Sequence, residues 1–315
     1  MAHFLLLFSV LSAFSAALAI PLSRSSIPRS VLELESKAFL KRQDFATLSP
    51  AQISSFQSFS FFASAAYCHP DTTINWSCGT NCDANAEFQP TASGGDGIVD
   101  QFWYVGFDSA LNNIVVAHQG TDPEKIVPLC TDADFFPTTL DESLFPGIDS
   151  SIKVHNGFAD SHARVAPDVL NATLATLSSH PDASVTMVGH SLGAAQALLD
   201  AVFLPLHLPS DTKFKYVGYG LPRVGNQEFA DYVDAHVLDV THVNNKEDFV
   251  PIIPGRFLGF VHPQGEIHIQ DSGDWVACPG QDNESDLCST GDVPDILDGE
   301  ISDHDGPYDV VTMGC

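Results

Sequence analysis

Residues 189–193 have the sequence G-H-S-L-G, and the serine at their centre, Ser191, is the residue best placed for covalent chemistry. In a G-x-S-x-G motif the serine sits in a strained turn between a strand and a helix, and its hydroxyl projects above the sheet. Glycine is needed on both sides because side chains there would collide with the neighbouring strand and helix. The motif predicts a nucleophilic serine. A capping serine in an ordinary glycine-rich turn is the alternative.

A serine hydroxyl is a weak nucleophile at neutral pH, so a histidine base and an orienting acid are expected. With this kind of turn, the usual chain order is serine, then acid, then histidine. Asp248 follows a predicted strand, where sheet enzymes place catalytic groups. His262, His268 and His304 come after it, and the first two lie in a predicted second hairpin. Taken alone, the residues leave His268 and His304 as equal candidates.

The elements expected around these residues indicate a parallel sheet covered by helices. Residues 99–107 and 114–117 predict a hairpin, and 185–188, 216–219 and 240–243 predict buried strands. Residues 158–177 follow helical spacing, although Pro167 predicts a late start or a bend. Residues 192–204 are apolar on nearly every side and predict a core helix. Strands that alternate with helices are typical of α/β proteins.

Six separated blocks of the sequence resemble the fungal class 3 lipase family, and they occur in the family's order. The blocks are residues 118–121, 154–158, 189–193, 219–226, 248–251 and 303–308. The resemblance implies an α/β-hydrolase fold in which a mostly parallel central sheet is flanked by helices, with a single domain and a short lid. It implies the triad Ser191, Asp248 and His304, which decides between the two histidines. It also implies two oxyanion donors, Thr121 and the amide of Leu192.

Two positions depart from the family's usual pattern. The family commonly has Phe-Arg before the glycine of the oxyanion block, and this chain has His118 and Gln119. A second glycine commonly follows the serine motif, where Ala194 stands here. Neither change touches a reacting group.

The resemblance implies an ester hydrolase that needs no metal or organic cofactor. A lid is expected over residues 122–131, and Phe135, Phe136, Leu140, Leu144 and Phe145 are available to line an apolar groove or to pack in the core. We expect a monomeric lipase that acts on acylglycerols at an oil–water interface. A feruloyl-type esterase of plant cell walls and a non-catalytic lipid-binding protein are the alternatives.

Composition limits the partners of the chain. Its 315 residues carry 40 acidic and 13 basic side chains, a formal charge of −27, which argues against nucleic acid and anionic lipid as partners. Residues 1–19 predict a signal peptide that ends at Ala17-Leu18-Ala19, and residues 20–42 predict a pro-segment that ends at Lys41-Arg42. Residues 43–315 then form the mature, secreted domain. Nothing beyond the signal peptide is apolar enough to insert stably in a membrane.

The cysteines fit an extracellular location. Cys78 and Cys82 are close enough in sequence to form a small loop, as are Cys278 and Cys288. The resemblance implies a third bond, Cys68–Cys315, which would leave Cys130 free. Paired C-x-x-C units are missing, so no zinc site is expected. Sequons for glycosylation are present at Asn75, Asn171 and Asn283.

Overall fold

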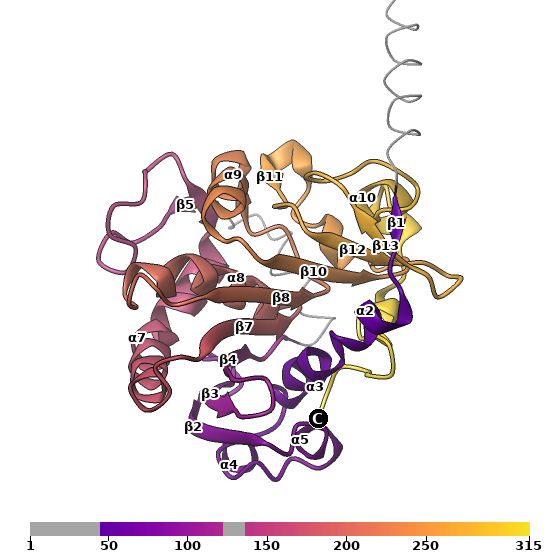
Figure 1. The fold of residues 1–315 in the computed structure, drawn as a ribbon. Helices are drawn as coiled ribbons and strands as arrows, with labels where there is room; N and C mark the ends of the chain where they lie inside the picture. The colour runs from indigo at the N-terminus through magenta and orange to yellow at the C-terminus, as the bar shows by residue number, and fades with distance from the viewer. Residues whose placement is uncertain (1–44, 122–135) are drawn as a thin grey trace, which may run out of the picture. The chain divides into compact units, whose positions relative to one another are not determined.

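The central feature of the computed structural model is a nine-stranded sheet, drawn in Figure 1. The structure describes residues 45–121 and 136–315, so the predicted leader, the pro-segment, the lid, Cys130 and Phe135 fall outside the described residues. The strands follow the order β1-β13-β12-β10-β8-β7-β4-β3-β2. Their bounds are β1 Ala46–Thr47, β2 Phe88–Gly94, β3 Trp103–Asp108, β4 Asn113–His118, β7 Ser184–His190, β8 Phe214–Tyr219, β10 Val240–Asn245, β12 Glu266–Ile269 and β13 Trp275–Cys278.

The middle of this sheet is parallel. Strands β4, β7, β8, β10 and β12 pair in parallel, and the antiparallel strands lie outside them. Because the strands are parallel, their carboxyl ends meet at one edge, where α/β proteins carry their sites. The predicted hairpin β3–β4 and the predicted strands β7, β8 and β10 are confirmed.

Helices cover both faces of the sheet (Figure 1). The alternating residues of β4 show this: Ile114 and Val116 pack in the core cluster of helices α7 and α8, whereas Val115 and Ala117 pack in the cluster of α3. Strands buried on both faces lose the polar alternation of a surface strand, which explains the continuous apolar run of β4. The α-helices are α2 Pro50–Ser54, α3 Gln57–Ala65, α4 Pro70–Thr73, α5 Thr80–Asp83, α7 Asn156–Ser179, α8 Leu192–Phe203, α9 Gln227–His236 and α10 Ser289–Asp292.

Two helices test the sequence patterns directly. Every residue of α8 is buried, as its apolar composition predicted. Helix α7 contains Pro167 in its interior and begins at Asn156, so of the two expectations for Pro167, a late start or a bend, the late start is wrong. Among the described residues, no helix has the length and apolar character needed to cross a membrane.

A smaller sheet and short 3-10 turns complete the described chain. The sheet has the order β11-β9-β6-β5, with bounds β5 Pro137–Thr139, β6 Lys153–His155, β9 Gly225–Asn226 and β11 Phe260–Val261. The 3-10 turns are η1 Leu204–Leu206, η2 Val250–Ile252, η3 Arg256–Leu258, η4 Ile296–Asp298 and η5 Ile301–Asp303. The expected second hairpin is formed by β12 and β13 and contains His268, whereas His262 follows β11 of the smaller sheet. The two histidines therefore do not share a hairpin.

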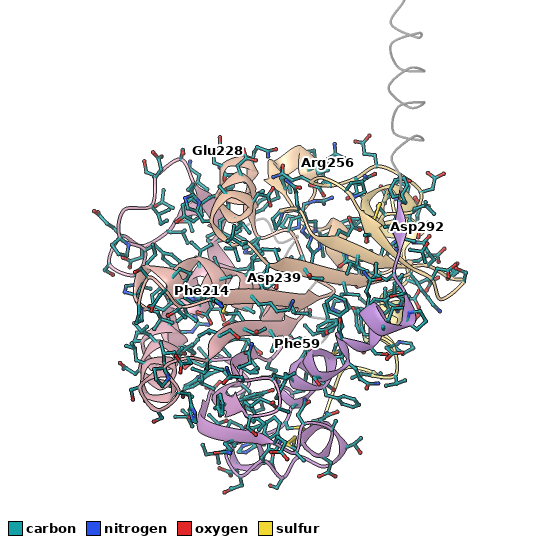
Figure 2. The ribbon with its side chains drawn as sticks, in the orientation of Figure 1. Phe59, Phe214, Glu228, Asp239, Arg256 and Asp292 are labelled. Carbon is teal, nitrogen blue, oxygen red and sulfur yellow. A yellow bond between two sulfur atoms is a disulfide. The ribbon has the colours of Figure 1, made fainter. Side chains whose placement is uncertain are left out.

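Among the described residues, disulfides join three pairs of cysteines: Cys68–Cys315, Cys78–Cys82 and Cys278–Cys288. The first bond joins Cys68, which follows helix α3 and a short turn, to Cys315, the last residue of the chain. Beside it, Ser64 Oγ donates to the carbonyl of Gly314 at 2.7 Å. The C-terminal segment is therefore fixed against α3. Figure 2 shows the charged side chains of Glu228, Arg256 and Asp292 at the margin of the molecule.

Candidate active site

Ser191 occupies the turn between β7 and α8, at the carboxyl edge of the parallel sheet. Its backbone has φ 59° and ψ −129°, a conformation that L residues rarely adopt and that costs of order 1–3 kcal/mol. The strain persists because neighbouring groups hold the turn: the amide of Ser191 donates to the carbonyl of Tyr219 at 2.9 Å. This is the sharp turn that the motif predicts.

Close packing around the turn explains its glycines. A Cβ at Gly189 would lie 2.3 Å from the carbonyl of Gly193, and a Cβ at Gly193 would lie 2.2 Å from the carbonyl oxygen of His118. Backbone atoms cannot withdraw as flexible side chains do, so alanine at either position would displace β4, β7 or α8. The two glycines thus let β7 and α8 approach each other and the end of β4.

His304 and Asp248 form a buried pair. His304 follows η5, and its Nδ1 lies 2.8 Å from Asp248 Oδ2; both side chains are 0% exposed. Asp248 follows β10, and its other oxygen accepts from the amide of Val250 at 2.9 Å. Because a carboxylate only accepts hydrogen bonds, His304 Nδ1 is the donor, and Nε2 keeps a free lone pair. That arrangement leaves the imidazole ready to accept a proton at Nε2.

The structure brings His304 to the serine turn. The rings of His304 and His190, the residue before Ser191, have centroids 4.4 Å apart. A Cβ on Gly220, which follows the Tyr219 carbonyl that holds Ser191, would lie 2.8 Å from His304 Cε1. Within the described residues, neither Ser191 Oγ nor His304 Nε2 has a hydrogen-bond partner, and both atoms are buried. Both atoms are therefore enclosed, and they are not hydrogen-bonded to each other.

The backbone of His304 is held by a chain of side chains that the sequence patterns did not reveal. Its carbonyl accepts from Tyr308 Oη at 3.0 Å and from His190 Nε2 at 2.8 Å. Since His190 Nε2 donates, its Nδ1 accepts, and Tyr67 Oη donates to it at 2.6 Å. Burial holds the pKa of His190 well below its usual value, so this ring is neutral. A neutral histidine beside His304 adds no competing charge.

The other two candidate histidines have structural contacts. His268 Nε2 donates to the carbonyl of Lys246 at 2.8 Å, and its Nδ1 lies 2.8 Å from Gln270 Nε2. His262 Nε2 donates to the carbonyl of Pro251 at 2.7 Å, and its ring stacks on His242. Neither pairs with Asp248. Geometry therefore favours His304 as the base, as the family resemblance implied.

The two oxyanion candidates lie on the elements that meet at the serine turn. Leu192 is the first residue of α8, where backbone amides have no partner within the helix and the helix dipole is positive. Thr121 is half-buried and lies three residues after the end of β4. Gly120, the residue before Thr121, shows how closely this loop approaches the serine turn. A Cβ on Gly120 would lie 2.6 Å from the carbonyl oxygen of His190.

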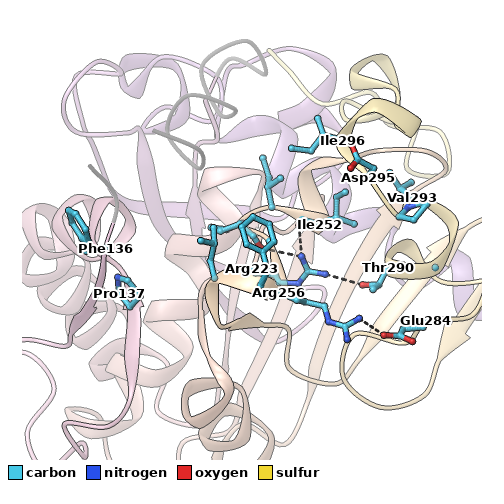
Figure 3. A pocket seen from close by; sticks show the side chains of 17 residues that line it. Phe136, Pro137, Arg223, Ile252, Arg256, Glu284, Thr290, Val293, Asp295 and Ile296 are labelled. Carbon is cyan, nitrogen blue, oxygen red and sulfur yellow. Dashed lines mark hydrogen bonds and ion pairs between the residues drawn. The ribbon is translucent and has the colours of Figure 1, made fainter. Parts of the chain in front are cut away.

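A pocket of about 1020 Å³ opens beside the loop that follows Asp248 (Figure 3). Ile252, Ile253, Val293 and Ile296 supply apolar walls, and Phe257 stands at 90% exposure among its lining residues. Ser191, Asp248 and His304 do not line it. The chain connects the pocket to the triad candidates, because Asp248 lies four residues before the lining residue Ile252. The segment between the pocket and His304 is also bonded to the residue before Asp248: the amide of Glu300 donates to the carbonyl of Glu247 at 2.7 Å.

The residues expected to line a groove divide between core and pocket. Phe145 is 3% exposed in the main core, and Leu140 and Leu144 pack against that core. Phe136 is 64% exposed and lines the large pocket with its neighbour Pro137. Phe145 packs against Phe203 and His162 in the interior, and with Leu140 and Leu144 it also lines a second pocket of about 470 Å³.

Glu266, Cys278 and Cys288 are close enough in space to suggest metal ligands. The two sulfurs are bonded to each other, and Glu266 Oε1 accepts from the amide of Ser289 at 2.8 Å. A thiolate is what a metal needs from cysteine, so this group offers no ligand set.

Arg223 braces the loop after Asp248 and supplies a stability test. The side chain is 2% exposed; it pairs with Asp282 at 2.8 Å and donates to the carbonyls of Ile252 and Pro254. Removing one partner of a buried pair leaves an uncompensated charge and costs about 3–5 kcal/mol. We expect Arg223→Met to lower the free energy of unfolding by that amount in urea denaturation.

Arg164→Met is the matched control, because Arg164 and Asp100 form an ion pair in which both side chains are 39% exposed. Pairs this accessible contribute about 0–1 kcal/mol. Equal losses in the two variants would contradict the bracing role of Arg223.

Comparisons with known proteins find similarity to lipases. The family model described as Lipase (class 3) matches residues 115–258. A secreted mono- and diacylglycerol lipase of Malassezia restricta is 32% identical over 270 residues, which cover 82% of this chain and 78% of the relative. Lipase II of Rhizopus niveus has a structure that matches with a TM-score of 0.72 at 28% identity, covering 86% of this chain and 99% of that one.

A further solved structure is described as a triacylglycerol lipase whose catalytic centre is a serine protease triad. It matches with a TM-score of 0.72 at 26% identity and covers 85% of this chain and 98% of its own. The α/β-hydrolase fold of these lipases is thus the fold found here, with its mixed central sheet and flanking helices.

Proposed function

Because the chain belongs to the class 3 lipase family, we propose that it is a secreted lipase that hydrolyses acylglycerol esters through an acyl-enzyme on Ser191. The observation that supports this most is the buried Asp248–His304 pair beside a strained serine at a strand-to-helix turn. The named relatives include mono- and diacylglycerol lipases and a triacylglycerol lipase. Their substrates are neutral lipid esters, which suit a chain with a formal charge of −27.

The proposed reaction has two halves. His304 Nε2 takes the Ser191 proton while Oγ attacks the ester carbonyl, and Thr121 and the Leu192 amide stabilise the oxyanion. The alcohol leaves with the proton from His304, and an ester between Ser191 and the acyl group remains. A water molecule then gives a proton to His304 and attacks this ester; the bond to Ser191 Oγ breaks, the acid is released, and His304 returns the proton to Ser191 Oγ. Asp248 keeps the proton of His304 on Nδ1 and stabilises the imidazolium.

A substrate panel tests this function against the alternatives. We expect the purified enzyme to hydrolyse triolein, diolein and long-chain p-nitrophenyl esters faster than methyl ferulate. The apolar walls of the large pocket support acyl chains rather than an aryl acid. A preference for methyl ferulate would instead support the feruloyl-esterase alternative. Failure to hydrolyse any ester would support the lipid-binding alternative.

We also propose that the rim of the large pocket contacts the lipid surface. Several apolar side chains on or near this rim are exposed, and the lipid interior is their natural environment. They are Phe136 at 64%, Phe257 at 90%, Leu258 at 41%, Ile296 at 37% and Leu297 at 92%. Apart from Phe136, which precedes β5, these residues belong to the loops that follow Asp248 and precede His304, so docking there would place lipid against loops that connect two of the triad candidates.

Phe257→Ser tests this docking. Burying a phenylalanine side chain contributes about 1.5–3 kcal/mol, so we expect roughly 10- to 100-fold weaker adsorption to triolein emulsions. Hydrolysis of a water-soluble short-chain ester should not change. Adsorption is measured by depletion of enzyme from the aqueous phase.

Leu238→Ser is the matched control, because Leu238 is 94% exposed and precedes β10, at the sheet edge opposite to Asp248. Adsorption of this variant should equal that of the unmodified enzyme. Equal adsorption by the Phe257 variant would contradict the docking surface.

Processing and modification complete the proposal. We infer that a signal peptide at residues 1–19 and a pro-segment at 20–42 are removed, so that the secreted enzyme begins at Gln43. Asn75 and Asn171 are exposed and suit glycosylation, whereas Asn283 is 6% exposed and its Nδ2 donates to the carbonyl of Pro279. N-terminal sequencing and glycopeptide mapping of the secreted protein test these sites.

A further inference from the structure

A carboxylate lies in the buried centre of the helix that follows the nucleophile. Asp200 of α8 is 0% exposed, and its two oxygens contact two different histidines. His118 Nε2 lies 2.6 Å from Oδ2, and His162 Nε2 lies 2.8 Å from Oδ1. His118 is the last residue of β4, and His162 belongs to α7. Three elements therefore meet at one buried acidic group.

Burying a charged group such as Asp200 costs free energy, which suggests that the group has a function. Burial raises the pKa of Asp200, but the neighbouring His118 and His162 outweigh this effect and lower the pKa to about 2. The carboxylate is thus charged, and an ion in a protein interior costs several kcal/mol that apolar side chains would not. Within the described residues, the Nδ1 atoms of both histidines have no hydrogen-bond partner. Asp200 is therefore the anchor that fixes both rings.

His118 also connects this anchor to the proposed oxyanion loop. Thr121 follows three residues later, and the stretch between them is held on two sides. Gln119 exchanges two hydrogen bonds with the backbone of Phe102, at 2.8 and 2.9 Å. On the other side, the carbonyl oxygen of His118 lies so close to α8 that a Cβ on Gly193 would come within 2.2 Å of it. The end of β4 therefore rests directly on the first turn of α8.

The two oxyanion donors belong to these same two elements. Leu192 begins α8, and Asp200 lies eight residues further along, about 12 Å at 1.5 Å per residue. Thr121 depends on β4 for its position. A bond between His118 and Asp200 therefore fixes how far β4 can slide along α8, and so fixes the spacing of the donors.

We propose that the His118–Asp200 hydrogen bond is a positioning device for the oxyanion hole, which sets Thr121 against the amide of Leu192. His162 supports it by holding the second carboxylate oxygen. His118 and Asp200 are positioning residues, because they act through Thr121 rather than on the substrate. The inference rests on the proposed function.

The test is a double-mutant cycle between His118→Phe and Thr121→Ala. The enzyme is assayed on a soluble p-nitrophenyl ester, and active sites are counted with a phosphonate that labels the nucleophilic serine. Thr121→Ala should lower kcat by about 100-fold, the usual cost of losing one oxyanion donor. His118→Phe should lower kcat by roughly 10- to 100-fold with little change in KM, as expected for a misplaced group. The double variant should be hardly slower than Thr121→Ala alone.

Two further variants separate positioning from stability. His162→Phe removes the other partner of Asp200 but leaves β4 attached, so it should lower the melting temperature with a much smaller loss of kcat. Asp200→Asn keeps the size of the side chain and removes the charge. It replaces His118→Phe in the same cycle if the phenylalanine variant does not fold.

The outcomes are distinguishable. Unchanged kcat in His118→Phe, or losses that multiply in the double variant, would overturn the positioning device and leave the proposed function intact. An equal loss of kcat in His162→Phe would also overturn it, because a general loosening of the core would then explain the data. Wild-type kcat in Thr121→Ala would remove the oxyanion assignment itself, and the positioning proposal with it.

Discussion

Replacing Ser191 with alanine is expected to lower kcat for every ester substrate by roughly 10⁶-fold, the loss typical of a deleted serine nucleophile. In the proposed mechanism Ser191 Oγ forms the acyl-enzyme, and alanine at this position of the turn between β7 and α8 has no oxygen that could replace it. Alanine also fits the space, since Ser191 Oγ has no hydrogen-bond partner among the described residues. Folding should therefore be preserved, which circular dichroism and thermal melting would check.

Ser161→Ala is the matched control for this substitution. Ser161 is also a buried serine, 6% exposed, and its Oγ accepts from Gln196 Nε2 at 2.9 Å. Its removal should cost about 1 kcal/mol of stability and leave kcat unchanged. Full hydrolysis by Ser191→Ala would show that the nucleophile lies elsewhere.

The second large effect is expected at Asp248. Asparagine at this position can keep the contact with His304 but favours the wrong tautomer, because its amide donates where the carboxylate accepts. Nε2 of His304 would then carry the proton and could not act as a base. We expect Asp248→Asn to lower kcat by about 10⁴-fold with a smaller change in KM, measured on a soluble ester.

Asp108→Asn separates this effect from the general cost of altering a buried acid. Asp108 is 2% exposed, and its carboxylate accepts from the amide of Leu111 at 2.9 Å. It ends β3 opposite Asn113, the first residue of β4, so it lies at the far edge of the sheet from Ser191. The control should lose stability but not kcat. Equal rate losses in both variants would argue against a triad role for Asp248.

Local patterns predicted the serine turn because its requirements are local. The strained turn, the two glycines, the preceding strand and the buried helix all lie within about twenty residues of Ser191, and each leaves a trace in the sequence. The position of Asp248 was predictable for a similar reason, since it lies three residues after the end of β10.

The histidine that pairs with Asp248 illustrates what local patterns cannot decide. His268 and His304 are both buried, and only the tertiary fold determines that one pairs with Asp248 and the other with the carbonyl of Lys246. The resemblance to a family favoured His304 because the family's motif carries that tertiary information. The placement of His262 failed because β11 pairs with β9, a partner far away in sequence.

The many histidines of the chain had no explanation in its sequence. His118, His162 and Asp200 are 38 to 82 residues apart, and no periodic pattern joins them. Their contact exists only because β4, α7 and α8 pack together. Likewise, Tyr67 and His190 meet across 123 residues to brace the carbonyl of His304.

The bond between Cys68 and Cys315 converts most of the chain into a covalent ring, because 247 positions separate the two cysteines. A protease that nicks one surface loop of this ring yields a molecule that is cut but still in one piece, and its halves can re-close on each other. In the chain-entropy account, a ring of this size restricts the unfolded state by about 5 kcal/mol. Reduction of the Cys68–Cys315 bond would release the two fragments and would also remove the restriction of the unfolded state. We therefore expect limited proteolysis to leave the oxidised protein in one piece and to fragment the reduced protein.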